Sequence, residues 1–227
     1  MPPRSIVVTV DTLPAVFELE EILHELREYA VTLRASPFGY LFSFIRTFAD
    51  APECVLPDRR DITPATPCIA AYLRHLEAVA AKRRTPLLDA PARIRLLFDD
   101  ERPVEAADLL QVPRGRITVS GMRAALDSAL RFLAGDATVD RIDAEFARAQ
   151  LWQWVRHETG VLDTGRIIGT RLFGELLAEE VARLGSDDGG AMIDDSALTG
   201  AARRLESLTT AAELAGTIDT EGDTDGA

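Results

Sequence analysis

The 227-residue sequence has no apolar run long enough to span a bilayer, and its Met-Pro-Pro-Arg start lacks the charged-then-apolar pattern of a signal peptide. We therefore expect a cytoplasmic protein with no membrane partner. Basic residues are also few: the sequence has 25 Lys and Arg but 37 Asp and Glu, which gives a formal net charge of -12. Because a nucleic-acid-binding protein needs a basic face to neutralise phosphates, we expect no nucleic-acid partner.

Cysteine is scarce, and the common catalytic motifs are missing. Cys54 and Cys68 have the spacing of neither a metal site nor a disulfide framework, so we expect both to be small buried residues. The sequence contains no P-loop, GxGxxG turn, HExxH motif or GxSxG elbow. What is present, 47% hydrophobic and 27% charged residues, fits one large or two small globular domains.

The stretch at residues 5–29 is typical of a strand, a carboxylate and a helix in succession. Residues 6–10 form the near-continuous apolar run of a strand buried in a parallel sheet. Pro14 suits the first turn of a helix, and apolar residues follow it at helical spacing. Asp11 lies where α/β proteins bind ligands, at the carboxyl end of the strand. It is either a carboxylate that satisfies N–H groups at the helix entry or a metal ligand or acid in a site.

Further along the chain, the aromatic and apolar run at residues 40–44 predicts a second buried strand. Thr66 and Pro67 have the residue types of an N-cap and first helical position, which predicts a helix through Arg84. Residues 85–97 could hold another short strand, although two prolines weaken that pattern.

From Asp99 the β-branched runs disappear and capped helical patterns replace them. We expect helices at residues 120–133, 140–157, 170–184 and 196–215, with a domain boundary near residues 99–103. The predicted organisation is therefore an α/β segment at residues 1–98 and an all-helical domain at residues 99–215. Residues 216–227 are acidic and poor in apolar residues, which predicts a disordered tail.

Three stretches resemble the malate synthase family. VDTLPAVFELEEILHELREYAVTL is similar to the family's Ile-Glu-Thr-Leu-Pro strand and the helix after it, and YLFSFIRTFADAPECVLPDR to the segment that follows its Trp-Asp-Tyr motif. ARAQLWQWVRHETGVLDTGRIIGTRLFGELLAEEVARL is similar to its C-terminal helical domain. The order of the three stretches is the same in the family.

The resemblance implies a TIM-barrel enzyme that condenses acetyl-CoA with glyoxylate. In the family, Mg²⁺ is held by a Glu and an Asp at the ends of adjacent barrel strands. An Asp of the C-terminal domain removes a proton from the acetyl methyl group, and an Arg stabilises the enolate oxygen. Such a reaction needs a positioned base, because the methyl group is a very weak acid, and fixed positive charge near the developing oxyanion.

Carried over to this sequence, the family's metal-binding Glu falls on Asp11, a carboxylate that is one methylene shorter. The second metal ligand, the Asp of Trp-Asp-Tyr, falls on Gly39, so that ligand is lost. A Mg²⁺ site with one carboxylate is poor, and the resemblance therefore implies only a weak metal role for Asp11. No residue is assigned to substrate binding.

The family's catalytic Asp falls on Asp140, in the stretch TVDRIDAEFARAQ. Asp140 and Asp143 also suit the N-cap and N3 positions of a helix, so capping alone could account for both. The two roles are compatible.

An eight-stranded barrel needs roughly 200–250 residues, but only about one hundred precede the helical domain here. We therefore expect an α/β fold of partial TIM-barrel-like units whose open strand edges another protein or a second copy would cover. The sequence leaves three hypotheses open. The chain condenses an acyl-CoA with a glyoxylate-like 2-oxo acid or aldehyde through an enolate, with altered or impaired activity; it is a non-catalytic relic or interaction protein; or it is an enolate-forming enzyme repurposed in a specialised pathway.

Overall fold

The computed structural model describes residues 5–89, 102–161, 163–186 and 193–216. The chain divides into two compact units, one of residues Met1–Thr47 and Ile62–Pro113, the other of Phe48–Asp61 and Arg114–Ala227. These units do not coincide with the domains expected at residues 1–98 and 99–215, which stay a prediction. From residue 217 on, the expected disordered tail lies outside the described residues.

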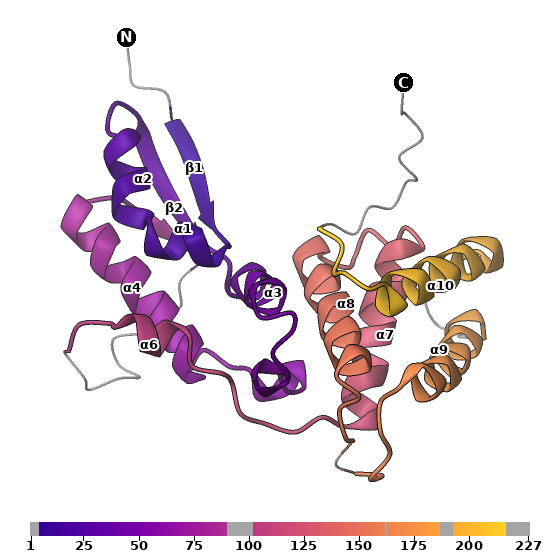
Figure 1. Ribbon diagram of the computed structural model, residues 1–227. Coiled ribbons are helices and arrows are strands. Elements are labelled where there is room, and N and C mark those ends of the chain that lie inside the picture. Colours follow the sequence, from indigo (N-terminus) through magenta and orange to yellow (C-terminus); the bar gives the residue numbers. More distant parts are fainter. Residues whose placement is uncertain (1–4, 90–101, 162, 187–192, 217–227) are drawn as a thin grey trace. The chain divides into compact units, whose positions relative to one another are not determined.

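The first unit contains a small parallel sheet (Figure 1). Its strands lie in the order β1 (Ser5–Val10), β2 (Ala30–Ala35) and β3 (Leu87–Leu88). Parallel neighbours need a crossover connection, and the helices α1 (Leu13–Phe17) and α2 (Leu19–Glu25) supply it between β1 and β2. This arrangement confirms the predicted α/β class with partial TIM-barrel-like units; the described strands form no closed barrel.

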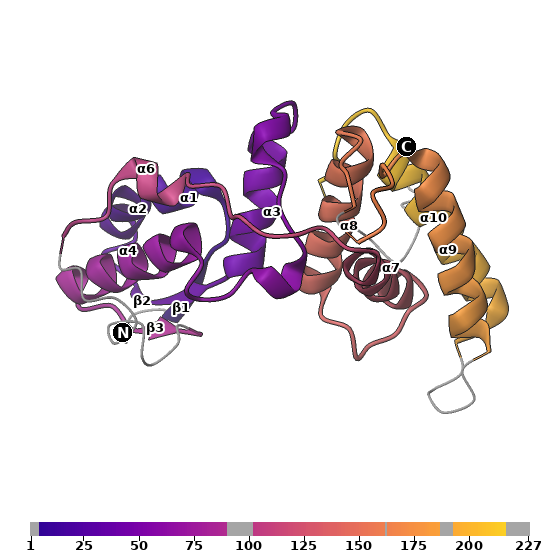
Figure 2. The ribbon, with the colours of Figure 1, turned by 90° about the horizontal axis from the view of Figure 1, so that it is seen from below.

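One face of the sheet is covered and the other is exposed. Figure 2 shows α1, α2 and α4 (Pro67–Arg83) on the same side of the strands. Val10 and Leu33 point to that side and are 0% exposed. Val7 and Leu88 point to the opposite face and are 52% and 41% exposed. The alternation follows from the two-residue period of a strand, which sends neighbouring side chains to opposite faces.

The strand predicted at residues 40–44 is wrong, because those residues lie inside helix α3 (Pro37–Thr47). Pro37 occupies the first helical position, where its missing N–H costs nothing. The buried residues Tyr40, Leu41, Phe44 and Ile45 recur at helical spacing, so burial on one helical face outweighs the β propensity of the aromatic run.

The helix predicted after Pro14 is divided at Glu18 into α1 and α2, and the strand β2 was not predicted. α4 follows Thr66 as predicted and ends at Arg83, and its C-cap Arg84 adopts the left-handed conformation typical of that position. The short strand expected within residues 85–97 is β3, and residues 90–97 lie outside the described residues. A short helix, α6 (Ala106–Leu109), completes the described part of this unit.

The second unit is helical, as predicted. Its helices are α7 (Val119–Leu133), α8 (Arg141–Arg156), α9 (Thr170–Gly185) and α10 (Asp195–Thr210). α7 contacts each of the other three, and their apolar faces share one buried core. The last helix ends at Thr210 rather than at the predicted residue 215. The segment Phe48–Asp61, with the 3-10 helices Pro52–Cys54 and Arg59–Asp61, belongs to this unit.

In the part of the chain that the structure describes, none of the helices combines the length and apolar character needed to cross a membrane.

Candidate functional site

Asp11 lies directly after β1, and a buried tyrosine holds the backbone next to it. The Tyr72 hydroxyl donates a 2.5 Å hydrogen bond to the Val10 carbonyl and accepts one of 2.8 Å from the Ser36 N–H. Tyr72 therefore ties together the carboxyl ends of β1 and β2. Thr12, not Asp11, provides the side-chain cap of α1, since its hydroxyl accepts the Ala15 N–H at 3.3 Å.

Two stacked tyrosines form the buried layer beneath this strand end. The rings of Tyr40 and Tyr72 lie 4.7 Å apart at an interplanar angle of 22°. Burial raises the pKa of both phenols above the usual value. Both hydroxyls therefore stay protonated at neutral pH and act as donors, Tyr72 to Val10 and Tyr40 to the Leu109 carbonyl.

The structure brings Asp11 and Gly39 together, as the resemblance implied for the two metal-ligand positions. A Cβ atom added to Gly39 would lie 2.7 Å from the Asp11 Cβ and 2.7 Å from the Ser36 Oγ. A second carboxylate therefore does not fit here unless the backbone moves. Mg²⁺ prefers octahedral oxygen coordination, and the described residues contain no group of three His, Cys, Asp or Glu able to hold a metal. The residues present do not fit the family's Mg²⁺ site.

Asp140 is the N-cap of α8, and its backbone position is fixed by that role. Its Oδ1 atom accepts the Ile142 N–H at 2.8 Å and the Asp143 N–H at 3.2 Å. An aspartate at this position satisfies two N–H groups that have no partner within the helix. Both bonds end on Oδ1 among the described residues, so Oδ2 remains able to accept a proton.

Asp140 is also open to solvent. It lines a shallow depression of about 510 Å³ formed by Phe132 and the loop from Gly135 to Arg141. Two other charged side chains of this depression are paired, Asp136 with Arg131 at 2.7 Å and Arg141 with Glu145 at 3.0 Å. The geometry is thus compatible with both roles considered for Asp140, as a helix cap and as an accessible base.

A segment at residues 54–57, which begins at the last residue of the first 3-10 helix, is held against α8 through its backbone. Gln153 donates to the Cys54 carbonyl at 3.0 Å and accepts the Leu56 N–H at 2.9 Å. Trp154 donates to the Leu56 carbonyl at 2.7 Å, and Gln150 to the Pro57 carbonyl at 2.6 Å. Because these four bonds are buried, they fix the segment firmly against the helix.

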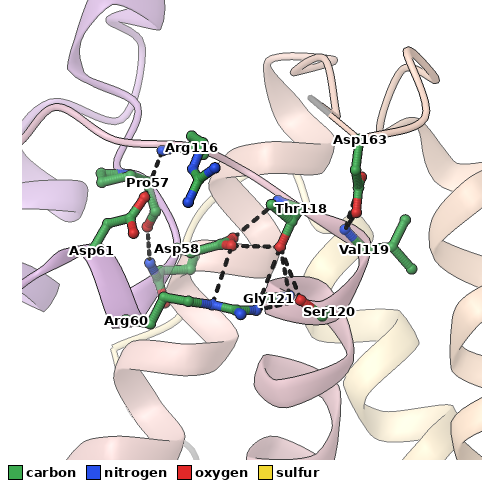
Figure 3. A network of polar contacts seen from close by, with 11 residues as sticks. Pro57, Asp58, Arg60, Asp61, Arg116, Thr118, Val119, Ser120, Gly121 and Asp163 are labelled. Carbon is green, nitrogen blue, oxygen red and sulfur yellow. Dashed lines mark hydrogen bonds and ion pairs between the residues drawn. The ribbon is translucent and has the colours of Figure 1, made fainter.

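The turn Asp58–Asp61 continues this segment and binds the entry of α7 (Figure 3). The Asp58 carboxylate, 2% exposed, accepts the Thr118 N–H at 3.2 Å and the Thr118 hydroxyl at 2.6 Å. Its fit is so close that a Cβ on Gly121 would lie 1.9 Å from Asp58 Oδ1. Asp61 accepts the Arg116 N–H at 2.7 Å.

The same turn reaches the entry of α8. Arg59 Nη2 lies 2.7 Å from Asp143 Oδ1, and Asp143 is the residue whose N–H binds Asp140. The sequence analysis assigned no role to residues 58–61 and so missed this contact. The charge pattern Asp-Arg-Arg-Asp, two basic residues between two acidic ones at the end of a stretch similar to the family, is the signal that could have revealed it.

The two cysteines and the two tryptophans of the chain belong to its buried cores. Cys54 and Cys68 are buried free thiols, as predicted, and burial raises the pKa of Cys68 to about 12. Trp152 and Trp154 are 1% and 0% exposed, and Trp152 donates to the Ala211 carbonyl at 2.9 Å. Neither tryptophan offers a surface for stacking a ligand.

Comparisons with known proteins match the two parts of the chain separately. Residues 1–125 match the family model described as malate synthase, TIM barrel domain, and residues 136–224 match malate synthase, C-terminal. Malate synthase A of Escherichia coli is 26% identical over 90% of this chain and 51% of its own length. The Oryza sativa malate synthase is 30% identical over 91% of this chain and 50% of its own length. The glyoxysomal malate synthase of Zea mays is 31% identical over 80% of this chain and 45% of its own length.

The chain spans about half the length of the curated relatives that it matches. The comparison with the Escherichia coli enzyme extends over 273 positions, more than the 227 residues of this chain. Within the matched region, that enzyme therefore has residues without a counterpart here.

Proposed function

Because this chain belongs to the malate synthase family, we propose that it performs the proton-abstracting part of a Claisen-type condensation, with Asp140 as the base. Its substrates would be an acyl-CoA, acetyl-CoA in the first place, and a glyoxylate-like 2-oxo acid or aldehyde. The observation that carries this proposal is the position of Asp140, an aspartate exposed on an open depression with its Oδ2 able to accept a proton.

In the proposed reaction, Asp140 takes a proton from the methyl carbon of the thioester, and the electrons of the broken C–H bond move onto the thioester oxygen as an enolate. The enolate carbon then forms a bond with the carbonyl carbon of the second substrate, whose oxygen takes up a proton. Hydrolysis of the thioester releases the CoA thiol. A general base held in place contributes roughly 10²–10⁴-fold to such a step.

We expect the second part of this reaction, the attack on the carbonyl, to be impaired. In the family a metal polarises that carbonyl, and Asp11 beside Gly39 does not fit such a site. Enolate formation depends on Asp140 and not on Gly39, so it should be retained more fully than condensation.

The test is to incubate the chain with acetyl-CoA in D₂O and to follow the incorporation of deuterium into the methyl group, which reports proton abstraction without condensation. Asp140→Asn should remove the activity, since an amide accepts no proton but still caps a helix. Asp194→Asn is the matched control, because Asp194 is the N-cap of α10 and its Oδ2 accepts the Ala197 N–H at 3.1 Å. Equal deuterium incorporation by the wild type and Asp140→Asn would refute the proposal.

A second candidate function is favoured by the edge of the sheet. Among the described residues β1 pairs only with β2, and its sequence SIVVTV contains no charge, proline or glycine that would protect an edge. Val7, 52% exposed, lies on the uncovered face. We propose that a strand of another protein or of a second copy covers this edge. Light scattering should then show an assembly that Val7→Lys weakens; a monomer that binds no second chain would contradict it.

A further inference from the structure

The turn Asp58–Asp61 joins the entries of two helices of the second unit. Asp58 and Asp61 bind the backbone and side chain at the start of α7, through Thr118 and Arg116 (Figure 3). Arg59 binds Asp143 in the first turn of α8. Buried hydrogen bonds from side chains of α8 to the backbone of residues 54–57 hold the chain just before this turn.

The contact between Arg59 and Asp143 leads directly to Asp140. The Arg59 Nη2 lies 2.7 Å from the carboxylate of Asp143, and the N–H of Asp143 donates to Asp140 Oδ1 at 3.2 Å. Asp143 thus holds Arg59 with its side chain and Asp140 with its backbone.

The charges around Asp140 explain how the contact between Arg59 and Asp143 can affect Asp140. Asp140 and Asp143 are three residues apart on one helix, where like charges repel each other. Arg59 neutralises the second carboxylate. The other charged groups of the depression have their own partners, Asp136 with Arg131 and Arg141 with Glu145.

We propose that Arg59 is a positioning residue for Asp140 and acts through Asp143. This inference rests on the proposed function, in which Asp140 is the base. Arg59 sets the direction of the Asp140 carboxylate by keeping the side chain of Asp143 turned away from it and the first turn of α8 intact.

The exposure of the pair separates positioning from stability. The Arg59 and Asp143 side chains are 41% and 32% exposed, and ion pairs at such sites contribute little to folding. Removing Arg59 should therefore leave the second unit folded, while the reaction at Asp140 suffers.

The experiment measures two quantities in the full chain. The first is the exchange of the methyl protons of acetyl-CoA in D₂O, which reports proton abstraction without condensation. The second is the amide hydrogen exchange of Ile142 and Asp143, whose N–H groups donate to Asp140. This measurement needs no turnover. The variants are Arg59→Ala, Arg59→Lys and the double variant Arg59→Ala with Asp143→Asn. Arg171→Ala is the control for net charge, since Arg171 is 91% exposed and pairs with Glu175 on α9.

We expect Arg59→Ala to lower kcat of methyl exchange by about tenfold with KM unchanged, because a small misplacement of a base costs rate rather than binding. The two amides should exchange about tenfold faster. Arg59→Lys keeps the charge and should restore most of the kcat and most of the amide protection. The double variant should also recover both quantities, because no unpaired carboxylate remains. Arg171→Ala should behave as the wild type.

Unchanged kcat and unchanged amide protection in Arg59→Ala would overturn the proposal. A wild-type chain without methyl exchange would refute the proposed function, but the amide measurement would still decide the role of Arg59. Should Arg59→Ala fail to fold, Arg59→Gln keeps the side-chain stem without the charge, and the same results are expected of it.

Discussion

Asp11 at the end of β1 and Asp140 at the start of α8 are the two carboxylates that the family resemblance singles out, and their surroundings differ. Beside Asp11, the neighbouring ligand position is Gly39, packed so closely that a Cβ would lie 2.7 Å from the Asp11 side chain. Beside Asp140, the neighbouring residues support the carboxylate with two N–H groups and leave it on an open depression.

The difference shows that a carboxylate at a family position is not by itself a site. In the first unit, Gly39 packs tightly against Asp11 at the position where the resemblance implies a second ligand. In the second unit, a connected set of contacts, from residues 54–57 through Asp58–Asp61 to Asp143, holds the first turn of α8. We therefore expect the chemistry to survive in the second unit rather than in the first.

Apart from changes to Asp140 itself, the largest effect is expected for Gly121→Ala. The new methyl group would lie 1.9 Å from Asp58 Oδ1, and the buried carboxylate cannot move without losing its bonds to Thr118. Overpacking of this kind should lower the free energy of unfolding of the second unit by about 3 kcal/mol. Urea unfolding followed by circular dichroism measures it.

Gly200→Ala is the matched control, because Gly200 lies in α10 with nothing within 4 Å of an added Cβ. Alanine in an exposed helical position should stabilise by about 0.5–1 kcal/mol. Equal changes in the free energy of unfolding for the two substitutions would contradict the close packing of Asp58 against Gly121.

A restored ligand tests the first unit. Gly39→Asp should lower the free energy of unfolding by about 2 kcal/mol without creating a Mg²⁺ site, since the Cβ clashes with Asp11 and Ser36. Gly39→Ala should cost a similar amount, because the clash arises at the Cβ. Melting curves with and without Mg²⁺ provide the measurement. A rise in melting temperature with Mg²⁺ in Gly39→Asp alone would show that the two positions can still hold a metal.

A smaller loss of stability is expected when the hydrogen bonds of the Tyr72 hydroxyl between the ends of β1 and β2 are removed. Tyr72→Phe removes the bond to the Val10 carbonyl and leaves the buried Ser36 N–H without an acceptor. The expected loss in stability is about 1–2 kcal/mol. Tyr29→Phe, at a tyrosine that is 42% exposed, should change the stability by less than about 0.5 kcal/mol. Thermal melts of both variants would test whether Tyr72 has the assigned role.

The smallest effect concerns the buried thiols. Burial raises the pKa of Cys68 to about 12, so at pH 8 only about one molecule in 10⁴ carries the reactive thiolate. Because Cys68 is also 0% exposed, iodoacetamide should label it only when the first unit opens, and the labelling rate should rise with added urea. Rapid labelling at pH 8 without denaturant would show that the core around Cys68 is looser than described.

The sequence predicted the parts of the structure that rest on local rules. The N-cap Asp140, the Thr66-Pro67 helix entry and the strand at residues 6–10 are short-range patterns, and the structure has them at or within a residue of the predicted bounds. The run at residues 40–44 was misassigned because its aromatic residues favour a strand in isolation, whereas their burial in α3 depends on the rest of the unit.

The contacts that support the candidate base were beyond sequence reasoning. Arg59 and Asp143 are 84 residues apart, and Asp58 and Thr118 are 60 apart. No periodicity links such pairs, and only the folded chain brings them together. The closeness of Asp11 and Gly39 was implied only by the family resemblance, because the sequence pattern placed a strand after Gly39 and did not predict β2 before it.

The most direct test of the central claim, that Asp140 is a working base, is the incorporation of deuterium into the methyl group of acetyl-CoA in D₂O, measured by mass spectrometry. It requires neither glyoxylate nor the metal position beside Gly39. The account predicts exchange by the wild type and by Asp194→Asn at least about 10² times faster than by Asp140→Asn. Equal rates for the wild type and Asp140→Asn would contradict it.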